Sequence, residues 1–368
     1  MFLEQKLKYN LSVFLLINLT FVILGVIFVY SASSYYALET LGQPLYYVKK
    51  QLFGIFLGTI AFIFARSIPL NFFKNISFLA LVSSTILTAL PLLICQFSYK
   101  VHGSHRWLNL YGFISQPSEL LKVALVMYLA SLLSRKKIIE TTIHKAAAPL
   151  SIILIVIGII LLKQPDFGCL VTLCATTLIM LFVANLPLRY FLGTILTAAP
   201  IGFLLVYLQP YRWQRILTYL NPWQDPQGTG FQIIQSLIAI GSGGLWGTGI
   251  AQSQQKFFYL PMQHTDFIFA IMAEEIGFIG SIFFITLCIL FLIFGCKLTL
   301  SLNNSFAIYL VQGIIILISL QFLINLFVST GLAPTKGIGL PFVSYGNTAL
   351  ICNMFMIGLI DNAVHEKL

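Results

Sequence analysis

The chain has 368 residues, of which 58% are hydrophobic and 9% are charged, and its mean hydropathy is +0.93. Because a soluble globular domain carries roughly 25% charged residues, this composition excludes an ordinary water-soluble enzyme, and its apolar content excludes a disordered chain. The few charges nevertheless sum to +10, from 21 Lys and Arg against 11 Asp and Glu, so a charge-poor chain holds a cation excess.

Long continuous apolar runs predict membrane-spanning helices rather than the short alternating strands of a β-barrel. We therefore predict an all-α polytopic membrane protein with about ten transmembrane helices in a single domain, residues 1–368. The first run, Leu11–Tyr30, is longer than the core of a signal peptide, so we interpret it as a retained first span. The spans are predicted near residues 11–31, 51–66, 75–95, 117–133, 149–162, 168–186, 190–208, 267–295, 305–328 and 343–361.

Lys and Arg in short loops predict which side of the membrane each loop faces. The densest group is Arg135, Lys136, Lys137 and Lys145, and placing it in the cytoplasm puts both termini there too. The opposite, extracytoplasmic side then receives about nine cations, where the rule expects few. Either the span count is wrong or the outer face needs positive charge. The outer cations are Lys49, Lys50, Lys100, Arg106, Lys163, Arg212, Arg215, Lys256 and Lys336.

The longest connection, about residues 209–266 between the seventh and eighth spans, is extracytoplasmic in this arrangement. A loop of this length without a function is uncommon. It contains Trp213, Trp223 and Trp246, which suit a membrane interface, and its Gly-rich middle at 231–250 could lie in that interface.

Ionisable residues within the spans are costly, so each needs a role. Glu119 and Lys122 lie three residues apart on one helix face and can pair. They are a structural ion pair, catalytic groups or substrate ligands. Asp166, which follows Gln164-Pro165, either caps the N-terminus of the sixth span or belongs to a site on the side of the long connection.

Asp266 is the main candidate for a general base, because it lies where the long connection enters the eighth span, at a membrane–water boundary. His264 lies two residues away. The alternative role for Asp266 is a helix cap. The adjacent pair Glu274-Glu275, two turns further on, is interpreted as structural, with one carboxylate paired to a Lys or Arg.

Cations lie beside interfacial tryptophans on the outer side, at Arg106-Trp107, Arg212-Trp213 and Arg215. Such groups suit an anionic amphiphile such as a lipid phosphate or pyrophosphate, although snorkelling of long side chains would give the same pattern. The sequence has no Walker A motif, HExxH, GxSxG elbow or nucleic-acid-binding module. Its six cysteines lie in or near apolar runs without a CxxC pair, which favours buried thiols over disulfides.

Seven stretches, in order along nearly the whole chain, resemble the SEDS family (shape, elongation, division and sporulation), the RodA and FtsW group. Seven patches in one order are far more specific than any single motif. They are Ser31–Ser34, Gly103–Trp107, Gln116–Glu119 with Lys122, Gln164–Gly168, Asn221–Trp223 through Gln235-Ser236, His264–Phe267 with Glu274–Gly277, and Pro334–Gly346.

The resemblance implies a ten-span fold with both termini cytoplasmic and a peptidoglycan glycosyltransferase in the bacterial cytoplasmic (inner) membrane. Its substrate would be lipid II, a disaccharide-pentapeptide on undecaprenyl pyrophosphate, polymerised at the outer face. The family's catalytic aspartate carries over to Asp266. Family cavity residues carry over to Glu119, Lys122 and Asp166, and its Arg-Trp pair to Arg106 and Trp107.

We expect the outer cations to stabilise the leaving pyrophosphate. A divalent cation, Mg²⁺ or Mn²⁺, could share this work, although the sequence shows no clear ligand cluster. The predicted substrate-binding residues are Arg106, Trp107, Glu119, Lys122, Asp166, Arg212, Arg215, Lys256, His264 and Lys336.

Within the family, Gln255–Pro261 and Pro334–Gly337 resemble the division branch, the FtsW type, whereas Gly241–Gly244 is more similar to the elongation branch. Septal wall synthesis is therefore the expected role, with an elongation polymerase as the alternative. Two departures from the family pattern are Met262, where Glu is usual, and the run 347–349, where a Gly and Ser hydroxyls are usual. The first removes a carboxylate near the proposed base.

The resemblance also implies partners: a class B penicillin-binding protein transpeptidase and other division proteins, besides lipid II and membrane lipids, with no nucleic acid. The small-residue face Gly54-x3-Gly58 could accept the partner's helix. Two other functions stay open. A lipid II flippase or transporter would suit a buried Glu119–Lys122 pair, and a scaffold would need no chemistry of its own.

Overall fold

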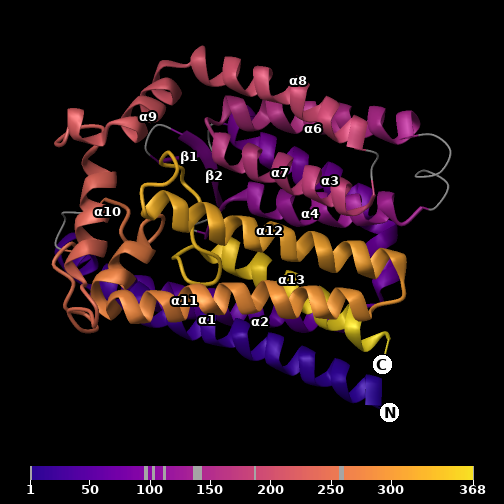
Figure 1. The fold of residues 1–368 in the computed structure, drawn as a ribbon, viewed down its shortest axis with the longest axis horizontal. Coiled ribbons are helices and arrows are strands. Elements are labelled where there is room, and N and C mark those ends of the chain that lie inside the picture. Colours follow the sequence, from indigo (N-terminus) through magenta and orange to yellow (C-terminus); the bar gives the residue numbers. More distant parts are fainter. Residues whose placement is uncertain are drawn as a thin grey trace.

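The computed structural model describes residues 2–94, 98–101, 104–110, 113–135, 143–185, 188–256 and 261–367, so that Gly103, Lys136, Lys137 and residues 257–260 of the sequence motifs lie outside it. The described chain is mainly helical with one small sheet (Figure 1). The helices are α1 (Phe2–Leu41), α2 (Tyr46–Ser67), α3 (Leu70–Leu93), α4 (Pro117–Leu133), α6 (Ile143–Lys163), α7 (Phe167–Val183), α8 (Leu188–Tyr207), α9 (Pro210–Leu220), the 3₁₀-helix η2 (Pro222–Gln224), α10 (Phe231–Ser242), α11 (Ile268–Ser301), α12 (Ser305–Ser329) and α13 (Asn347–His365). The strands are β1 (Ser98–Val101), β2 (Ser104–Leu110) and β3 (Phe113–Ser115), paired antiparallel in the order β1-β2-β3.

Each predicted span overlaps one helix, and the all-α membrane class is confirmed, whereas the count of about ten spans stays a prediction. Within the described residues, six helices are individually long and apolar enough to cross a membrane: α1, α2, α3, α11, α12 and α13. The helices α8 and α9 meet at 99° and would count as a seventh span if taken together. The shorter α4 and α7 have 17 residues each; α4 contacts α3, α7, α12 and α13, and α7 contacts α4, α6, α8 and α12.

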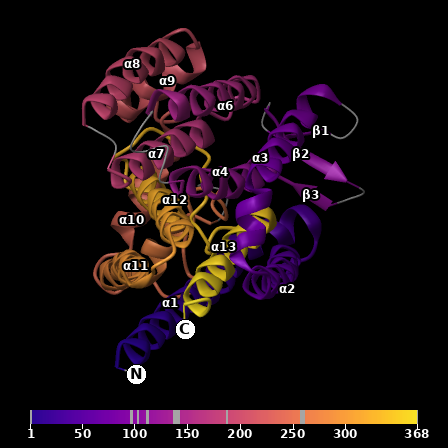
Figure 2. The same ribbon diagram turned by 90° about the vertical axis from the view of Figure 1, so that its right-hand side faces the viewer.

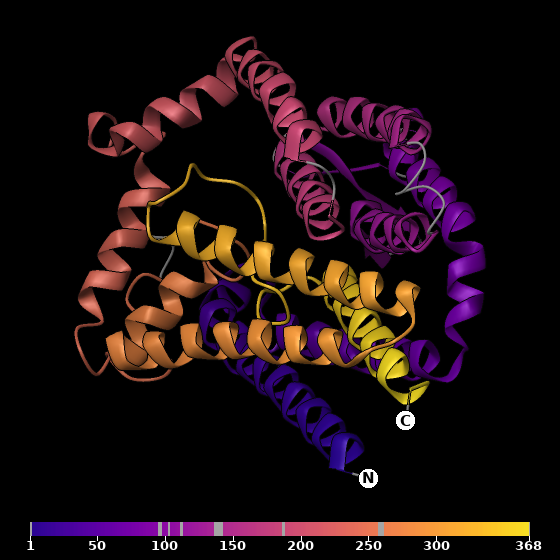
Figure 3. The same cartoon turned by 45° about the vertical axis from the view of Figure 1, so that its right-hand side comes forward.

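The helices run back and forth between two ends of the molecule. Both termini lie at one end, and α9 and α10 lie toward the other (Figure 1, Figure 3); the sheet also lies toward that other end in Figure 1. Seen along the bundle, α4 and α12 lie in the middle, with α6 and α8 on one side and α1 and α2 on the other (Figure 2). The end that holds both termini is called the terminal end, and the end that holds α9 and α10 is called the site end.

Aromatic side chains hold the central helices together. Phe21 of α1 lies 4.9 Å from the ring of Phe322 on α12, and Phe14 lies 5.1 Å from the ring of Phe291 on α11. All four are essentially buried. Tilted aromatic pairs at these distances add packing energy beyond their buried area, so α1, α11 and α12 form a firm frame.

The small-residue face of α2 is already occupied, so its predicted role as a docking site for a partner helix is wrong. Gly54 and Gly58 are buried against α13, where a Cβ on either residue would collide with Asn347 or Met354. The close approach that small residues allow is therefore used within the chain itself.

Two features at the site end were not expected from the sequence. The first is the sheet before α4, whose strands are too short to stand out as an alternating pattern. The second is that the predicted loop 209–266 contains α9, η2 and α10. In α10 the residues Ile233, Ile234 and Ala239 are buried, so this segment packs on α11 and α12 instead of lying free in an interface.

Candidate functional site

Four of the cations predicted on the outer side line one cavity at the site end. The cavity has a volume of about 150 Å³ and lies between β2, the turn from α6 to α7, α9 and the segment 334–337. Segments far apart in the sequence thus bring basic and acidic side chains together. Its charged and hydroxyl-bearing lining includes Arg106, Asp166, Tyr211, Arg212, Arg215 and Lys336.

Arg106 ties the sheet to the start of α7. Its guanidinium donates hydrogen bonds to the backbone carbonyls of Gln164 (3.2 Å) and Pro165. Its Nη1 also lies 3.6 Å from Asp166 Oδ1, which makes an ion pair. Because one planar guanidinium holds three groups of a single turn, Arg106 shapes the turn and supplies positive charge to the cavity.

Asp166 combines the two roles that the sequence left open. As the N-cap of α7, its side chain accepts a hydrogen bond from the Cys169 backbone N–H at 3.3 Å. It is also a member of the cavity lining and only 2% exposed, and its Oδ2 has no hydrogen-bond partner among the described residues. A buried carboxylate oxygen without a donor is rare and calls for an explanation, such as a ligand.

Asp266 lies in the turn before α11, beside Gly337 of the cavity lining. A Cβ on Gly337 would lie 3.4 Å from Asp266 Oδ2 and 3.8 Å from Arg106 Nη1, so this glycine leaves space between acid and guanidinium. Loss of hydration raises the pKa of Asp266 to about 7, against the opposing charges of Arg106 and Arg215. A carboxyl group with this pKa can accept a proton near neutral pH, as a general base must.

Asn325 of α12 fixes Asp266 relative to the segment that follows α12. Its Nδ2 donates hydrogen bonds to the backbone carbonyls of Asp266 (2.9 Å) and Ile338 (2.8 Å). Nearby, Ser344 Oγ donates to the carbonyl of Thr265 at 2.5 Å. These bonds join two loops that the sequence separates by about 70 residues, and so they set the geometry around Asp266.

The remaining cations reach the cavity from α9 and from the segment 334–337. Arg215 Nη1 donates a hydrogen bond to the Thr335 carbonyl at 3.1 Å. The guanidinium of Arg212 lies 5.2 Å, and the Lys336 ammonium 5.7 Å, from the centre of the Phe167 ring. Burial lowers the pKa of Lys336. One aromatic ring therefore collects two cations at the cavity by cation–π attraction.

Glu119 and Lys122 form the predicted pair on α4, with Lys122 Nζ 2.7 Å from Glu119 Oε1. Lys122 interacts electrostatically with Asp166 and Cys169 at the start of α7, although it is not part of the described cavity lining. At the start of α4, the Gln116 backbone N–H donates to Thr348 Oγ1 (3.2 Å), a hydroxyl from the run that departs from the family pattern. Arg106 and Asp266 thus lie together beside Gly337, and Lys122 interacts from α4 with Asp166 of the cavity lining.

Lys256 does not lie with the cavity cations. It is buried, its Nζ lies 3.9 Å from Glu275 Oε1, and it donates a hydrogen bond to the Ala251 carbonyl. Burial lowers its pKa, while Glu275 and Glu274 oppose that shift. Glu274 accepts from the Gln254 backbone N–H at 2.8 Å. The acidic pair thus has the basic partner that the sequence predicts, and Lys256 is engaged there.

His264 also lies apart from the cavity. Its ring centre is 4.6 Å from that of Tyr47, and Tyr36 and Tyr345 stand close by. Burial lowers the pKa of His264 to about 4, so its ring is neutral at physiological pH. Trp107, the neighbour of Arg106 on β2, is half-buried and outside the described lining.

The described residues do not fit a resident metal ion. They contain no group of three or more His, Cys, Asp and Glu side chains that could hold one. At the cavity, Asp166 and Asp266 both face guanidinium groups, and the other charged lining is cationic. Mg²⁺ and Mn²⁺ prefer several oxygen ligands, so the predicted divalent cation has no ready ligand set here.

Several residues of the site were not among the candidates. Phe167 and Gly337 lie within quoted motifs, so their place next to charged candidates was the available signal. Asn325 is a polar residue in a long apolar run, which marks a buried hydrogen-bonding role. Tyr211, next to Arg212, carried no signal of its own.

Known proteins resemble this chain over nearly its whole length. Residues 11–368 match the model of the FtsW, RodA and SpoVE family, described as "Cell cycle protein". The chain is 38% identical to the "Probable peptidoglycan glycosyltransferase FtsW" of Geobacter metallireducens, over 98% of this chain and 96% of that protein. It is 39% identical to the "Stage V sporulation protein E" of Bacillus subtilis, over 94% of each.

Two solved structures have the same architecture. One is described as "Structural coordination of polymerization and crosslinking by a peptidoglycan synthase complex"; its similar chain is 27% identical, with a TM-score of 0.78 over 96% of this chain and 97% of that one. The other is the rod shape determining protein RodA of Thermus thermophilus, 23% identical, with a TM-score of 0.70 over 96% of each chain. The latter likeness supports the fold alone.

Proposed function

The chain belongs to the FtsW, RodA and SpoVE family, and from this membership we propose that it is a peptidoglycan glycosyltransferase that polymerises lipid II. One observation of the site carries the proposal. A carboxyl group whose pKa is raised to about 7, Asp266, lies beside a cavity lined by four cations. A base next to a site for an anionic leaving group is what glycosyl transfer from a lipid pyrophosphate requires.

The base step is assigned to Asp266. Its carboxylate takes the proton of the 4-hydroxyl group on the acceptor sugar as that oxygen attacks the anomeric carbon of the donor. The bond between this carbon and the pyrophosphate oxygen breaks, and undecaprenyl pyrophosphate leaves with the bonding electrons. Arg106 and Arg215 lower the pKa of Asp266 and so keep part of it ionised near neutral pH.

The leaving group is assigned to the cavity cations. Negative charge grows on the pyrophosphate as the bond breaks, and Arg212, Arg215 and Lys336 are held close to where it would sit. Phe167 and the Thr335 carbonyl fix these side chains before the reaction, so little reorganisation is needed. Arg106 and Asp166 form an ion pair in the same cavity lining.

The orientation in the membrane is inferred from the distribution of Lys and Arg between the two ends of the molecule. We infer that the terminal end faces the cytoplasm and the site end faces outward in the bacterial inner membrane. Arg66, Lys74, Arg135 and Lys297 belong to the terminal end, in agreement with the positive-inside rule. Division is the favoured setting, since relatives of this chain include proteins named FtsW, although one relative is a sporulation protein.

We also propose a transpeptidase of the class B penicillin-binding type as the partner. The similar structure that belongs to a peptidoglycan synthase complex supports this pairing. Because Gly54 and Gly58 face α13, the partner's helix would have to use another surface of the bundle.

The test of the proposed function is polymerisation of purified lipid II by the full chain reconstituted with its transpeptidase partner. We expect Asp266→Asn to reduce glycan product to background, because the amide cannot take a proton. Glu39→Gln, which removes an exposed carboxylate, is the matched control and should polymerise normally. Undiminished synthesis by Asp266→Asn would exclude Asp266 as the base, and translocation of lipid II without product would favour a transporter.

The divalent cation stays a prediction. Polymerisation by the same complex is measured after chelation with EDTA and again after Mg²⁺ or Mn²⁺ is added back. Loss of product with EDTA and its recovery with the ion would support a divalent cation bound by lipid II or by the protein.

A further inference from the structure

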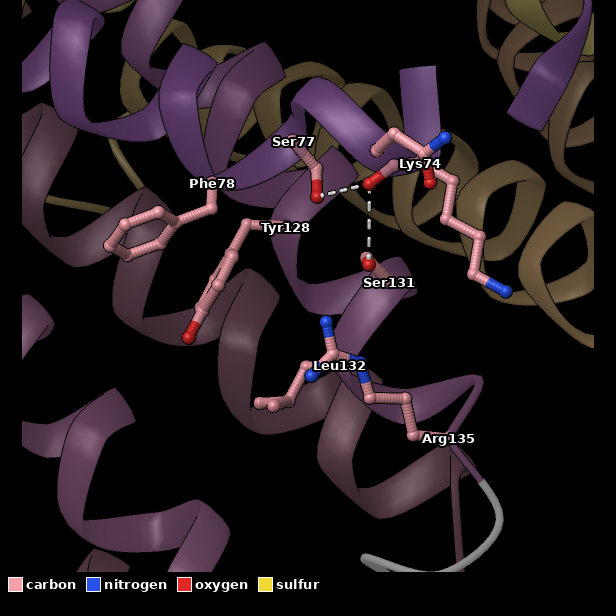
Figure 4. A pocket seen from close by; sticks show the side chains of 8 residues that line it. Lys74, Ser77, Phe78, Tyr128, Ser131, Leu132 and Arg135 are labelled. Atoms are coloured by element: carbon pink, nitrogen blue, oxygen red, sulfur yellow. Dashed lines mark hydrogen bonds between the residues drawn. The ribbon is translucent and has the colours of Figure 1, made fainter. Parts of the chain in front are cut away.

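A second cavity lies at the terminal end, far from Asp266 along the helices. It occupies about 210 Å³ between α3 and α4 (Figure 4). Nothing in the proposed reaction uses it, because that chemistry takes place at the site end. Its lining includes Lys74, Ser77, Phe78, Tyr128, Ser131 and Arg135.

The cavity carries two positive charges without a described counter-ion. Lys74 lies near the start of α3, and Arg135 follows the end of α4. Neither forms an ion pair with a carboxylate of the described residues. At the same end Arg66, by contrast, lies 3.0 Å from Asp361. Both cations line the cavity, with the Lys74 ammonium and the Arg135 guanidinium on opposite sides of Ser131 (Figure 4), and a cationic lining without an acid favours an anionic ligand.

The polar wall of the cavity is held rigidly. Ser77 Oγ and Ser131 Oγ both donate to the Lys74 backbone carbonyl, at 2.8 Å and 3.5 Å, which fastens α3 to α4 at this level. Figure 4 shows the Arg135 guanidinium folded back toward Ser131 instead of extending away from the helix. Arg135 is exposed, so a ligand at the surface of the protein can reach its guanidinium.

The other wall is apolar and continues onto the membrane-facing surface. Phe78 is 57% exposed, and its ring centre lies 6.0 Å from that of Tyr128. Further along α3, Leu79 and Ile86 are exposed at 67% and 57%. The cavity therefore opens where a charged headgroup could enter while hydrocarbon chains lie along α3.

We propose that this cavity binds the phosphate of an anionic membrane lipid in the leaflet at the terminal end. Arg135 binds the phosphate oxygens, Lys74 adds positive charge from the other side of Ser131, and the acyl chains follow Phe78 and the outer face of α3. The cavity is smaller than the pockets of about 300–1,000 Å³ that hold drug-sized molecules. Its volume therefore suits the headgroup of a lipid and not the entire lipid. A soluble phosphate ester presents the same oxygens but lacks the chains that would use the apolar wall.

The test is native mass spectrometry of the full chain, released from vesicles that contain phosphatidylglycerol and phosphatidylcholine. We expect Lys74→Gln with Arg135→Gln to lower the retained phosphatidylglycerol, relative to phosphatidylcholine, by on the order of tenfold. Arg135→Lys should retain much of the binding because the charge remains. Lys297→Gln is the matched control, since Lys297 is an exposed cation at the same end that lies over Phe294 and outside the cavity.

Two results would overturn the proposal. One is equal loss of phosphatidylglycerol in Lys297→Gln and in the double variant, which would mean a diffuse charge effect. The other is full displacement of the lipid by glycerol phosphate at equal concentration, which would assign the site to a soluble phosphate ester. Elution of every variant as the same monodisperse species checks that the double variant folds. Phe78→Ala should weaken lipid retention without changing any binding of glycerol phosphate.

Discussion

The two carboxylates at the cavity differ because of what surrounds each of them. Asp166 is held by the α7 N-terminus and by Arg106, so its position is fixed and its charge is compensated. Asp266 has its backbone fixed by Asn325, while its carboxylate makes no hydrogen bond or ion pair that the described residues show. A carboxylate that is held in place through its backbone, but is not itself engaged in a hydrogen bond or ion pair, is suited to taking and releasing a proton.

The pH dependence of polymerisation should follow Asp266. Because its pKa is raised to about 7, the base is protonated and inactive well below pH 7 and becomes active as the pH rises through that value. Arg215→Gln removes a positive charge that lowers this pKa, so the rising limb of the rate profile should move to higher pH. Rates measured with lipid II from pH 5.5 to 8.5 check this.

Arg215→Lys serves as the control for the pH experiment. It keeps the positive charge and should leave the limb close to its original position, even where the maximum rate falls. A limb that does not move in Arg215→Gln would show that another group governs the profile.

Gly337 offers a way to change the base without removing it. A methyl group here would make ordinary van der Waals contact with Asp266 Oδ2 and would occupy the space between this atom and Arg106. We expect Gly337→Ala to fold normally but to polymerise lipid II on the order of tenfold to a hundredfold more slowly, because the acceptor can no longer reach the carboxylate in a productive geometry.

The measurements are the rate of glycan synthesis and the thermal unfolding midpoint of the same preparation. Gly241→Ala places a methyl group where nothing lies within 4 Å and should change neither by much. A slow Gly337→Ala variant that also unfolds early would argue against a specific effect at the base.

At the residue scale, the sequence identified the charged residues and motifs of the site better than it predicted which side chains lie next to one another. Asp266, Arg106 and Asp166 were candidates, and the structure brings them together. Lys256, as one of the outer cations, and His264, two residues from Asp266, were predicted to belong to the same site. The side chain of Lys256 instead meets Glu275, and His264 packs among tyrosines. Which side of a turn each side chain faces depends on tertiary packing that spacing alone does not encode.

At the element scale, the break in α11 joins the long connection to the membrane helices. Gly277 has φ 65° and ψ −166°, outside the helical range, and the segment around Gly247 packs against it. The Thr248 and Gly249 backbone N–H groups donate to the carbonyls of Glu274 and Glu275. The bonds lost at the break are thus replaced by bonds from the connection.

Gly277→Ala should therefore destabilise the site end. The new Cβ would collide with the Gly247 backbone nitrogen, and the positive φ disfavours any side chain. We expect a loss of about 1–3 kcal/mol in the free energy of unfolding, together with reduced polymerisation. Unfolding in detergent by heat or denaturant measures the first quantity. Gly241→Ala, inside α10 with open space around it, is the matched substitution and should be neutral or slightly stabilising.

An unchanged Gly277→Ala midpoint would mean that the break relaxes without cost. More generally, the helices were predictable because each is a long apolar run, whereas this break, the sheet and α9 were not. Their residues are neither apolar enough nor regular enough to give a periodic signal, and they form because distant segments supply their hydrogen bonds.

At the scale of the whole molecule, the net charge of +10 has two separate sources. Cations of the terminal end accord with the orientation that we propose. Those of the site end divide again: four line the cavity, Lys256 serves Glu275, and Lys49 and Lys163 are exposed. Composition showed the excess, but the sequence alone could not show that part of it converges on one place. Removing two cavity cations, and separately two exposed cations, distinguishes an effect of the cavity from an effect of net charge alone.

Arg212→Gln with Lys336→Gln and, separately, Lys49→Gln with Lys163→Gln each remove two charges from the same end and lower the net charge from +10 to +8. If the cavity stabilises the leaving pyrophosphate, the first pair should slow lipid II polymerisation on the order of a hundredfold. The second pair should leave it nearly unchanged. Equal effects would mean that the outer cations act only through the general field at the membrane surface, and that field would weaken for both pairs as salt is added. A defect of the cavity pair that persists at high salt places the effect in partly buried contacts, where screening is weak, and therefore at the anion site beside Asp266.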